Sequence, residues 1–160
     1  MTSFQAIAER FTAILDKLRL ATDSSRTTLR IDIDEAGFHV DDPAAEAAGS
    51  GVSTLLGMTA LKQRDIDTVK WLDEHRIALV QNETEGAIPA PPDALIKVYG
   101  VKAQMLAPIV RGDKLVGWIS VHENRKTRNW QPDHVALLEA AVDEVHAVLD
   151  GAGFKSLGDR

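Results

Sequence analysis

The order of apolar and polar residues predicts a helix at each end of the chain. From Phe4 to Leu20, apolar residues recur every three or four positions with charged residues between them, as on an amphipathic helix. A second stripe of the same period begins after Pro132 and ends at Gly151. Each helix has one apolar face, so the two together can cover one face of a sheet.

Several segments between these helices have the patterns typical of β-strands. Thr27 to Asp34 alternates between apolar and polar residues. Gln104 to Val110 and Leu115 to His122 flank the turn Arg111 to Lys114 and together predict a hairpin, because Gly and Asp tolerate the backbone of tight turns. Ile77 to Gln81 is predicted as a further strand.

The remaining segments are predicted as short helices and loops. Helices are expected from Asp65 to His75 and from Pro91 to Tyr99, where Gly100 ends the second. An Ala-rich turn of helix that includes Glu46 is expected after Pro43, and residues 52–62 are interpreted as a loop with a possible helical turn. Phe38 to Val40 is a candidate short strand.

This order of elements predicts one domain of the α+β class. We expect a central antiparallel sheet of five to six strands, with the terminal helices on one face. Loops and short helices then enclose a ligand pocket on the other face. Residues 1–151 are assigned to the domain, and residues 152–160 to a flexible C-terminal tail.

Strand alternation sorts the candidate site residues onto the pocket face. If Leu29 and Ile31 face the terminal helices, Arg30 and Asp32 face the other way. On the second strand of the hairpin, Trp118, Ser120 and His122 lie on one side. Gln104 begins the first strand of the hairpin with the same polar character.

A guanidinium on this face requires an anion, because an unpaired buried charge is unfavourable. One interpretation is that Arg30 binds the carboxylate or phosphate of a small ligand. The other is an exposed strand face on which Arg30 pairs with Asp32 or Glu46. Tyr99 would close the pocket with its ring or pack in the core, and Trp118 is the preferred apolar wall.

Histidines offer a second type of chemistry. His122 in the pocket would donate to a ligand or act as general acid or base, and His39 near a turn is a weaker candidate. An acid–base pair of either histidine with Glu46, Asp32 or Glu83 is possible, although no spacing motif supports it. No two histidines have metal-ligand spacing, so no metal site is predicted.

Composition excludes several classes of function. The net charge is −6, which argues against nucleic-acid binding or an anionic-membrane surface. The chain has no cysteine, so disulfides and thiolate chemistry are ruled out. No apolar run approaches the length of a membrane span and the start lacks the pattern of a secretory signal, so a cytoplasmic protein is expected.

A set of short motifs in a fixed order resembles the GAF domain family. The motifs are Tyr99-Gly100-Val101, Gln104 to Ile109, Gly112 followed by Leu115 to Trp118, Val121-His122, and Trp130 to Pro132 followed by Leu137-Leu138. The resemblance covers most of the chain. It implies a central antiparallel sheet with a small-molecule pocket. It also implies ligands such as cyclic nucleotides, linear tetrapyrroles, amino acids, 2-oxo acids or simple anions.

The absence of cysteine separates this chain from two branches of that family. Covalent attachment of a bilin through a cysteine is impossible here, and the methionine sulfoxide reductase members work with cysteines. His122 falls where the pigment-binding branch tends to place a pocket-facing histidine. No cofactor is therefore expected.

Three functional hypotheses follow. The first is a sensor or regulatory domain that binds a small polar or anionic metabolite. The second is a small cytoplasmic enzyme of the hydrolase, isomerase or hydratase type that uses the same pocket. The third is a structural dimerisation domain with an emptied pocket. In each case the amphipathic N- and C-terminal helices predict a homodimer.

Overall fold

The sheet at the centre of the protein has five strands, and each neighbouring pair is antiparallel. The structure is a computed structural model, and it describes residues 4–157. The strands are β1 (Arg26–Ile31), β2 (Ala45–Ala48), β3 (Leu79–Gln81), β4 (Ala103–Arg111) and β5 (Lys114–Glu123). Their order across the sheet is β2-β1-β5-β4-β3. The predicted α+β class and antiparallel sheet are confirmed.

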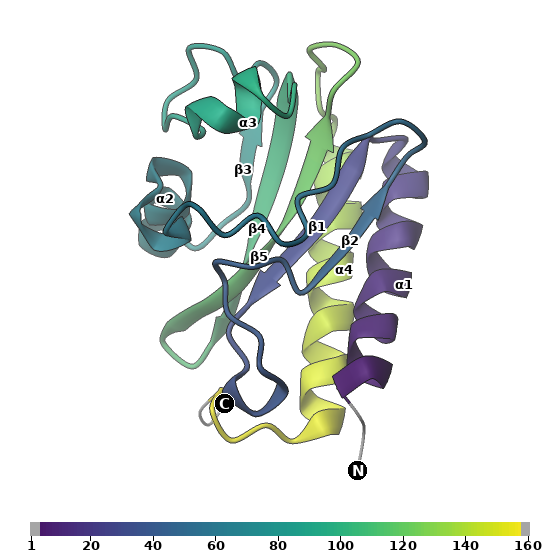
Figure 1. Cartoon of the computed structure of the whole chain (residues 1–160), viewed down its shortest axis with the longest axis vertical. Coiled ribbons are helices and arrows are strands. Elements are labelled where there is room, and N and C mark those ends of the chain that lie inside the picture. Colours follow the sequence, from purple (N-terminus) through teal and green to yellow (C-terminus); the bar gives the residue numbers. More distant parts are fainter. Residues whose placement is uncertain (1–3, 158–160) are drawn as a thin grey trace.

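Two long helices cover one face of the sheet. They are α1 (Phe4–Thr22) and α4 (Pro132–Ala152), which pack against each other behind the strands in Figure 1. Their apolar stripes join the sheet residues that point toward them, such as Leu29, Ile31 and Val121, in one buried core. The α4 helix ends at Gly153 in the left-handed conformation, two residues beyond the glycine expected to end it.

The opposite face is covered by shorter elements and a loop. The helices α2 (Asp67–His75) and α3 (Asp93–Lys97) lie over the β3 and β4 side of the sheet. A long connection between β2 and α2 crosses in front of the strands (Figure 1). Residues 52–66 of that connection are called the covering loop below, and they include a short 3₁₀ turn, η2 (Gln63–Asp65). A second, smaller core under α2 includes Val69, Leu72 and Trp118.

The central hairpin forms as predicted. Strands β4 and β5 pair through a two-residue turn, Gly112-Asp113, in which Gly112 has a φ of 62°, and the register shifts once, between Ile109 and Val110. At Gly117 on β5 a Cβ atom would lie 2.2 Å from the carbonyl oxygen of Arg30, so only glycine fits where the two strands approach there.

The expected helical turn around Glu46 is wrong, because Ala45–Ala48 forms the edge strand β2 paired with β1. Alanine favours helices by less than about 1 kcal/mol per residue over most alternatives. Pairing with β1 and burial of Ala45 and Ala47 against α1 outweigh this preference. The candidate strand at Phe38 to Val40 reduces to a single bridge between Ile33 and Phe38.

The segment after α4 packs on the domain as far as it is described. Leu157 is buried in the main core and Phe154 packs against it. The backbone N–H groups of Lys155 and Ser156 both donate to the carboxylate of Glu35, which lies in the 3₁₀ turn η1 (Asp34–Ala36). The rest of the predicted tail, residues 158–160, lies outside the described residues.

Candidate functional site

Antiparallel register places the candidate side chains in rows on the face under the covering loop. Residues opposite each other on neighbouring strands point to the same side of the sheet. The rows are Arg26, His122, Gln104 and Gln81; then Thr28, Ser120, Leu106 and Leu79; then Arg30, Trp118 and Pro108. One end of this face is therefore polar, and the other combines one guanidinium with an aromatic wall.

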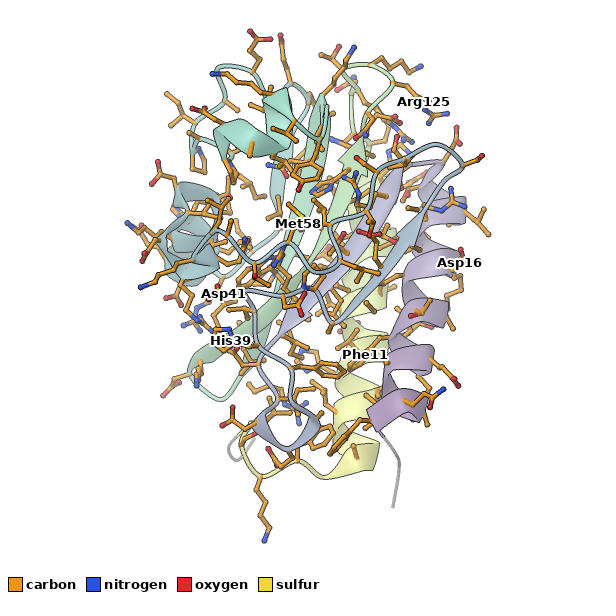
Figure 2. All side chains as sticks on the ribbon, in the orientation of Figure 1. Phe11, Asp16, His39, Asp41, Met58 and Arg125 are labelled. Carbon is orange, nitrogen blue, oxygen red and sulfur yellow. The ribbon has the colours of Figure 1, made fainter. Side chains whose placement is uncertain are left out.

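A cavity of about 190 Å³ lies between these rows and the elements that cover them. All six residues predicted to bind ligand line it: Arg30, Tyr99, Gln104, Trp118, Ser120 and His122. The covering loop contributes mainly apolar side chains to the other wall, and Met58, labelled in Figure 2, is among them. Met58 is 46% exposed, because the loop lies at the surface.

Arg30 carries a buried charge that no carboxylate of residues 4–157 neutralises by an ion pair. Arg30 is 8% exposed, and its Nη1 donates to the carbonyl oxygen of Val40 at 2.9 Å. The carboxylates considered as partners are engaged elsewhere, since Asp32 pairs with Arg64 and Glu46 pairs with Arg26. Burial lowers the pKa of Arg30 to about 10, although Asp42, Asp41 and Glu46 act in the opposite direction.

His122 is fixed in one protonation state by Arg26. The Arg26 Nη1 lies 3.0 Å from Nδ1 of His122, and a guanidinium can only donate. Nδ1 is therefore the acceptor, and the imidazole is neutral with its proton on Nε2. Burial lowers the pKa of His122 well below its usual value, and the charges of Arg26 and Arg30 lower it further. His122 can thus offer an N–H donor to the cavity.

Gln104 is oriented by a chain of amide hydrogen bonds. Its Nε2 donates to the side-chain oxygen of Gln81 at 2.8 Å, and the Gln81 amide donates to the carbonyl oxygen of Pro89 at 2.7 Å. With its amide nitrogen engaged outside the cavity, Gln104 can present its oxygen as an acceptor.

The covering loop is held by carboxylates from β2 and from the segment that precedes it. Glu46 accepts hydrogen bonds from the backbone of Leu55 and the hydroxyl of Thr54. Asp42 and Asp41 accept from backbone N–H groups further along the loop. These bonds fix the loop over the cavity and occupy the acidic side chains nearest to Arg30.

The remaining candidates for acid–base catalysis lie apart from the cavity. His39 is exposed, and Asp32 and Asp41 lie 3.9 and 3.6 Å from its ring nitrogens. His39, which is labelled in Figure 2, and Asp32 line a separate surface pocket of about 170 Å³. Glu46 faces Arg26 at 3.8 Å. The structure therefore does not bring His122 together with His39, Asp32 or Glu46.

Sequence reasoning missed Arg26 and the covering loop. The first strand was predicted to begin at Thr27, but β1 begins at Arg26. Arg26 is two positions before Thr28 and four before Arg30, so extending the alternation would have placed it on the same face. The loop residues have no periodicity, and nothing in the sequence signals that they line a cavity.

Within residues 4–157, no group of three or more histidine or acidic side chains is arranged to hold a metal ion. In the same part of the chain, the helices are too short or too polar to cross a bilayer.

A cavity enclosed on one face of an antiparallel sheet, with helices on the other, defines a small-molecule-binding class of domain. The family model of the GAF domain matches residues 6–149, so this chain belongs to the GAF domain family. No curated protein matches the chain.

Solved structures with a similar fold include GAF domains from cyanobacteria. The blue-light absorbing form of the PixJ GAF domain of Thermosynechococcus elongatus has a TM-score of 0.74 at 15% identity, covering 93% of this chain and 88% of that chain. The photoproduct state of GAF3 from Slr1393 of Synechocystis has a TM-score of 0.72 at 17% identity, with 92% and 95% covered. A phycocyanobilin-bound GAF domain from a cyanobacterial phytochrome has a TM-score of 0.69 at 15% identity, with 95% and 96% covered. At these identities the likeness shows the fold.

The volume of the cavity can be compared with the size of a linear tetrapyrrole of the kind named for the phytochrome domain. Its volume of about 190 Å³ is below the range of about 300–1,000 Å³ typical of pockets for drug-sized ligands. A molecule with four pyrrole rings is at least as large as such ligands. The chain also has no cysteine to which a bilin could be attached.

Proposed function

We propose that this domain is a cytoplasmic sensor that binds a small anionic metabolite in the cavity and transmits its presence to a signalling partner. The observation that carries the proposal is the guanidinium of Arg30. It lines the cavity, is buried, and has a carbonyl oxygen as its hydrogen-bond partner where a carboxylate would compensate its charge. A ligand anion would supply the missing charge.

The geometry supports binding over acid–base catalysis. His122 has its Nδ1 engaged by Arg26 and its pKa lowered, so near neutral pH it holds a proton on Nε2 and cannot accept one. Among residues 4–157, no carboxylate lines the cavity to act in its place. The polar groups that do line it are suited to orienting a ligand.

The test is a thermal shift screen of the purified domain against a metabolite library, with native mass spectrometry to detect co-purified ligand. A ligand at 100 times its Kd adds about 2.7 kcal/mol to the free energy of unfolding. Ala60→Trp fills the cavity from the exposed covering loop and should abolish the shift. Ala48→Trp, on an exposed position of β2, is the matched control and should retain it.

Two outcomes would overturn the proposal. One is a screen in which no metabolite raises the melting temperature. The other is a shift that persists in Ala60→Trp, because the ligand would then bind elsewhere. Biliverdin serves as a separate arm of the screen, and we expect no protein-bound absorbance because the cavity is too small.

We also propose a homodimer through α1 and α4. The two helices pack side by side, and each exposes an apolar residue, Leu20 and Leu137, away from the core. Light scattering coupled to size exclusion should give a dimer, and Leu137→Asp should shift it toward monomer. A monomer of the unmodified chain at micromolar concentration contradicts this proposal.

A further inference from the structure

Two buried arginines lie on the cavity face, and they differ in how their charges are compensated. Arg26 faces the carboxylate of Glu46, donates twice to the carbonyl oxygen of Ser53 and bonds His122. Arg30 has the single bond to the Val40 carbonyl. Of the two, Arg30 lines the cavity and Arg26 does not. The cavity thus presents one positive charge.

We infer that the ligand is a monocarboxylate with an apolar body, and that the cavity selects against the same molecule carrying an ammonium or a second carboxylate. This inference rests on the proposed function and names the chemical class of its ligand. A planar carboxylate matches the fork of donors on a guanidinium.

Rejection of an ammonium group follows from what surrounds the cavity. Apart from Arg30, its lining consists of neutral polar and apolar residues. The acidic side chains closest to Arg30 accept hydrogen bonds from the backbone of the covering loop. An ammonium inside would lose its water, gain no carboxylate and be repelled by Arg30.

A second carboxylate on the ligand is disfavoured because the cavity has no second positive charge to compensate it. One guanidinium compensates one negative charge, and the second guanidinium on this face is already engaged by Glu46 and His122. The other donors in the cavity, such as the Ser120 hydroxyl and the Nε2 of His122, are neutral. They can bind an uncharged oxygen of the ligand, but they cannot neutralise a further charge.

The apolar body is inferred from the walls and the volume. Leu61 and Ile66 of the covering loop face Leu106 and Trp118 of the sheet across the cavity, with Val69 of α2 beside them. A volume of about 190 Å³ holds roughly 13 to 19 water-sized groups, at about 10–15 Å³ for each water-sized sphere. A short aromatic or branched aliphatic acid has this size.

The experiment measures binding by calorimetry for four ligands that share one benzyl body. The reference acid is 3-phenylpropanoate. Its amide lacks the carboxylate charge, phenylalanine adds an ammonium group, and benzylmalonate adds a second carboxylate. A second pair, 4-methylpentanoate and leucine, repeats the ammonium comparison on a branched body. We expect at least one of the two simple acids to bind, and to bind at least tenfold more tightly than each of its own analogues.

Variants then locate the selectivity. Arg30→Gln should reduce the preference for acid over amide at least tenfold and leave the affinity for the amide unchanged. Arg10→Gln, an exposed charge change on α1, should leave both affinities unchanged. If Arg30→Gln fails to fold by circular dichroism, Arg30→Met replaces it, and the ligand series on the unmodified domain decides by itself.

The inference is overturned if an analogue binds within tenfold of its acid, or if neither acid binds at 10 mM. If a different metabolite binds in the cavity under either outcome, the proposed function stands and the chemical class is wrong. If neither the acids nor the metabolite library bind, both fail.

Discussion

The side chains of Arg26 and His122 lie directly opposite each other on β1 and β5 and are joined by a 3.0 Å bond from Nη1 to Nδ1. This bond makes the histidine a neutral donor, while the charge of Arg26 is compensated by the carboxylate of Glu46. The character of the site, a single guanidinium among neutral groups, depends on this pairing.

The first prediction concerns the titration of His122. Its folded pKa lies below its unfolded value because of burial and the charges of Arg26 and Arg30. The unfolded state therefore binds the proton first as pH falls, and the histidine contributes stability above about pH 6.5 that is lost below it. We expect its Nε2–H tautomer to persist at pH 6 by ¹⁵N NMR.

The same titration can be followed in stability. The free energy of unfolding should fall by at most about 1.4 kcal/mol per pH unit below pH 6.5 on account of this residue. His122→Gln, which can accept from Arg26 through its oxygen, should flatten the slope. An unchanged slope in that variant would show that other groups are responsible.

The second prediction is that Arg30 destabilises the ligand-free domain. Its guanidinium is buried without an ion pair, and burial holds its pKa at about 10. Replacing even a buried ion pair by apolar side chains of similar volume is often neutral or stabilising by about 1–4 kcal/mol, and an unpaired charge lacks the compensating partner. Arg30→Met should therefore raise the free energy of unfolding in urea, and a loss of stability would mean that the Val40 bond compensates the charge.

The third prediction concerns Glu123, which is fully buried and accepts hydrogen bonds from Ser25, Arg125 and Arg128. Burial raises its pKa, but these bonds outweigh burial and lower the pKa to about 2. A carboxylate with a depressed folded pKa gives stability that is present above its unfolded pKa of about 4.5 and lost as pH falls toward 2.

Glu123→Gln should reduce the free energy of unfolding at pH 7 by about 2–3 kcal/mol, because hydrogen bonds to a charged group contribute about 1.5–3 kcal/mol. It should also weaken the loss of stability between pH 4.5 and 2. Glu144→Gln removes an exposed ion pair with Lys17 and should change stability by less than about 1 kcal/mol. Equal effects of the two variants would contradict the prediction.

The fourth prediction is that Gly117→Ala destabilises the sheet beside the cavity. The added Cβ would meet the Arg30 carbonyl oxygen at 2.2 Å and the Ile31 Cα at 2.8 Å, and these are backbone atoms that cannot rotate away. We expect a loss of about 1–3 kcal/mol by urea unfolding. Gly151→Ala, where a Cβ meets no atom within 4 Å, should be neutral or stabilising.

Local sequence patterns were enough to predict the helices, strands and turns that depend on residues close together in the chain. The period of α1 and α4, the alternation of β1 and the turn chemistry of Gly112 each depend on neighbours within a few residues, and each is confirmed. Alternation also placed Arg30, Ser120 and His122 on one face, and the structure brings them to one cavity. The ligand-binding role of these residues remains a prediction.

By itself, the sequence determined the fold class, the face of the sheet that carries the polar residues and the absence of thiol chemistry, because alternation, helical period and composition are properties of the chain. Only the tertiary structure decided which charges meet. Glu46 pairs with Arg26 because Ala45–Ala48 joins the sheet as a strand, and Asp32 pairs with Arg64 because the covering loop folds back over the sheet. Such pairings join residues far apart in the chain, so no local pattern could show that Arg30 would have no ion pair within residues 4–157.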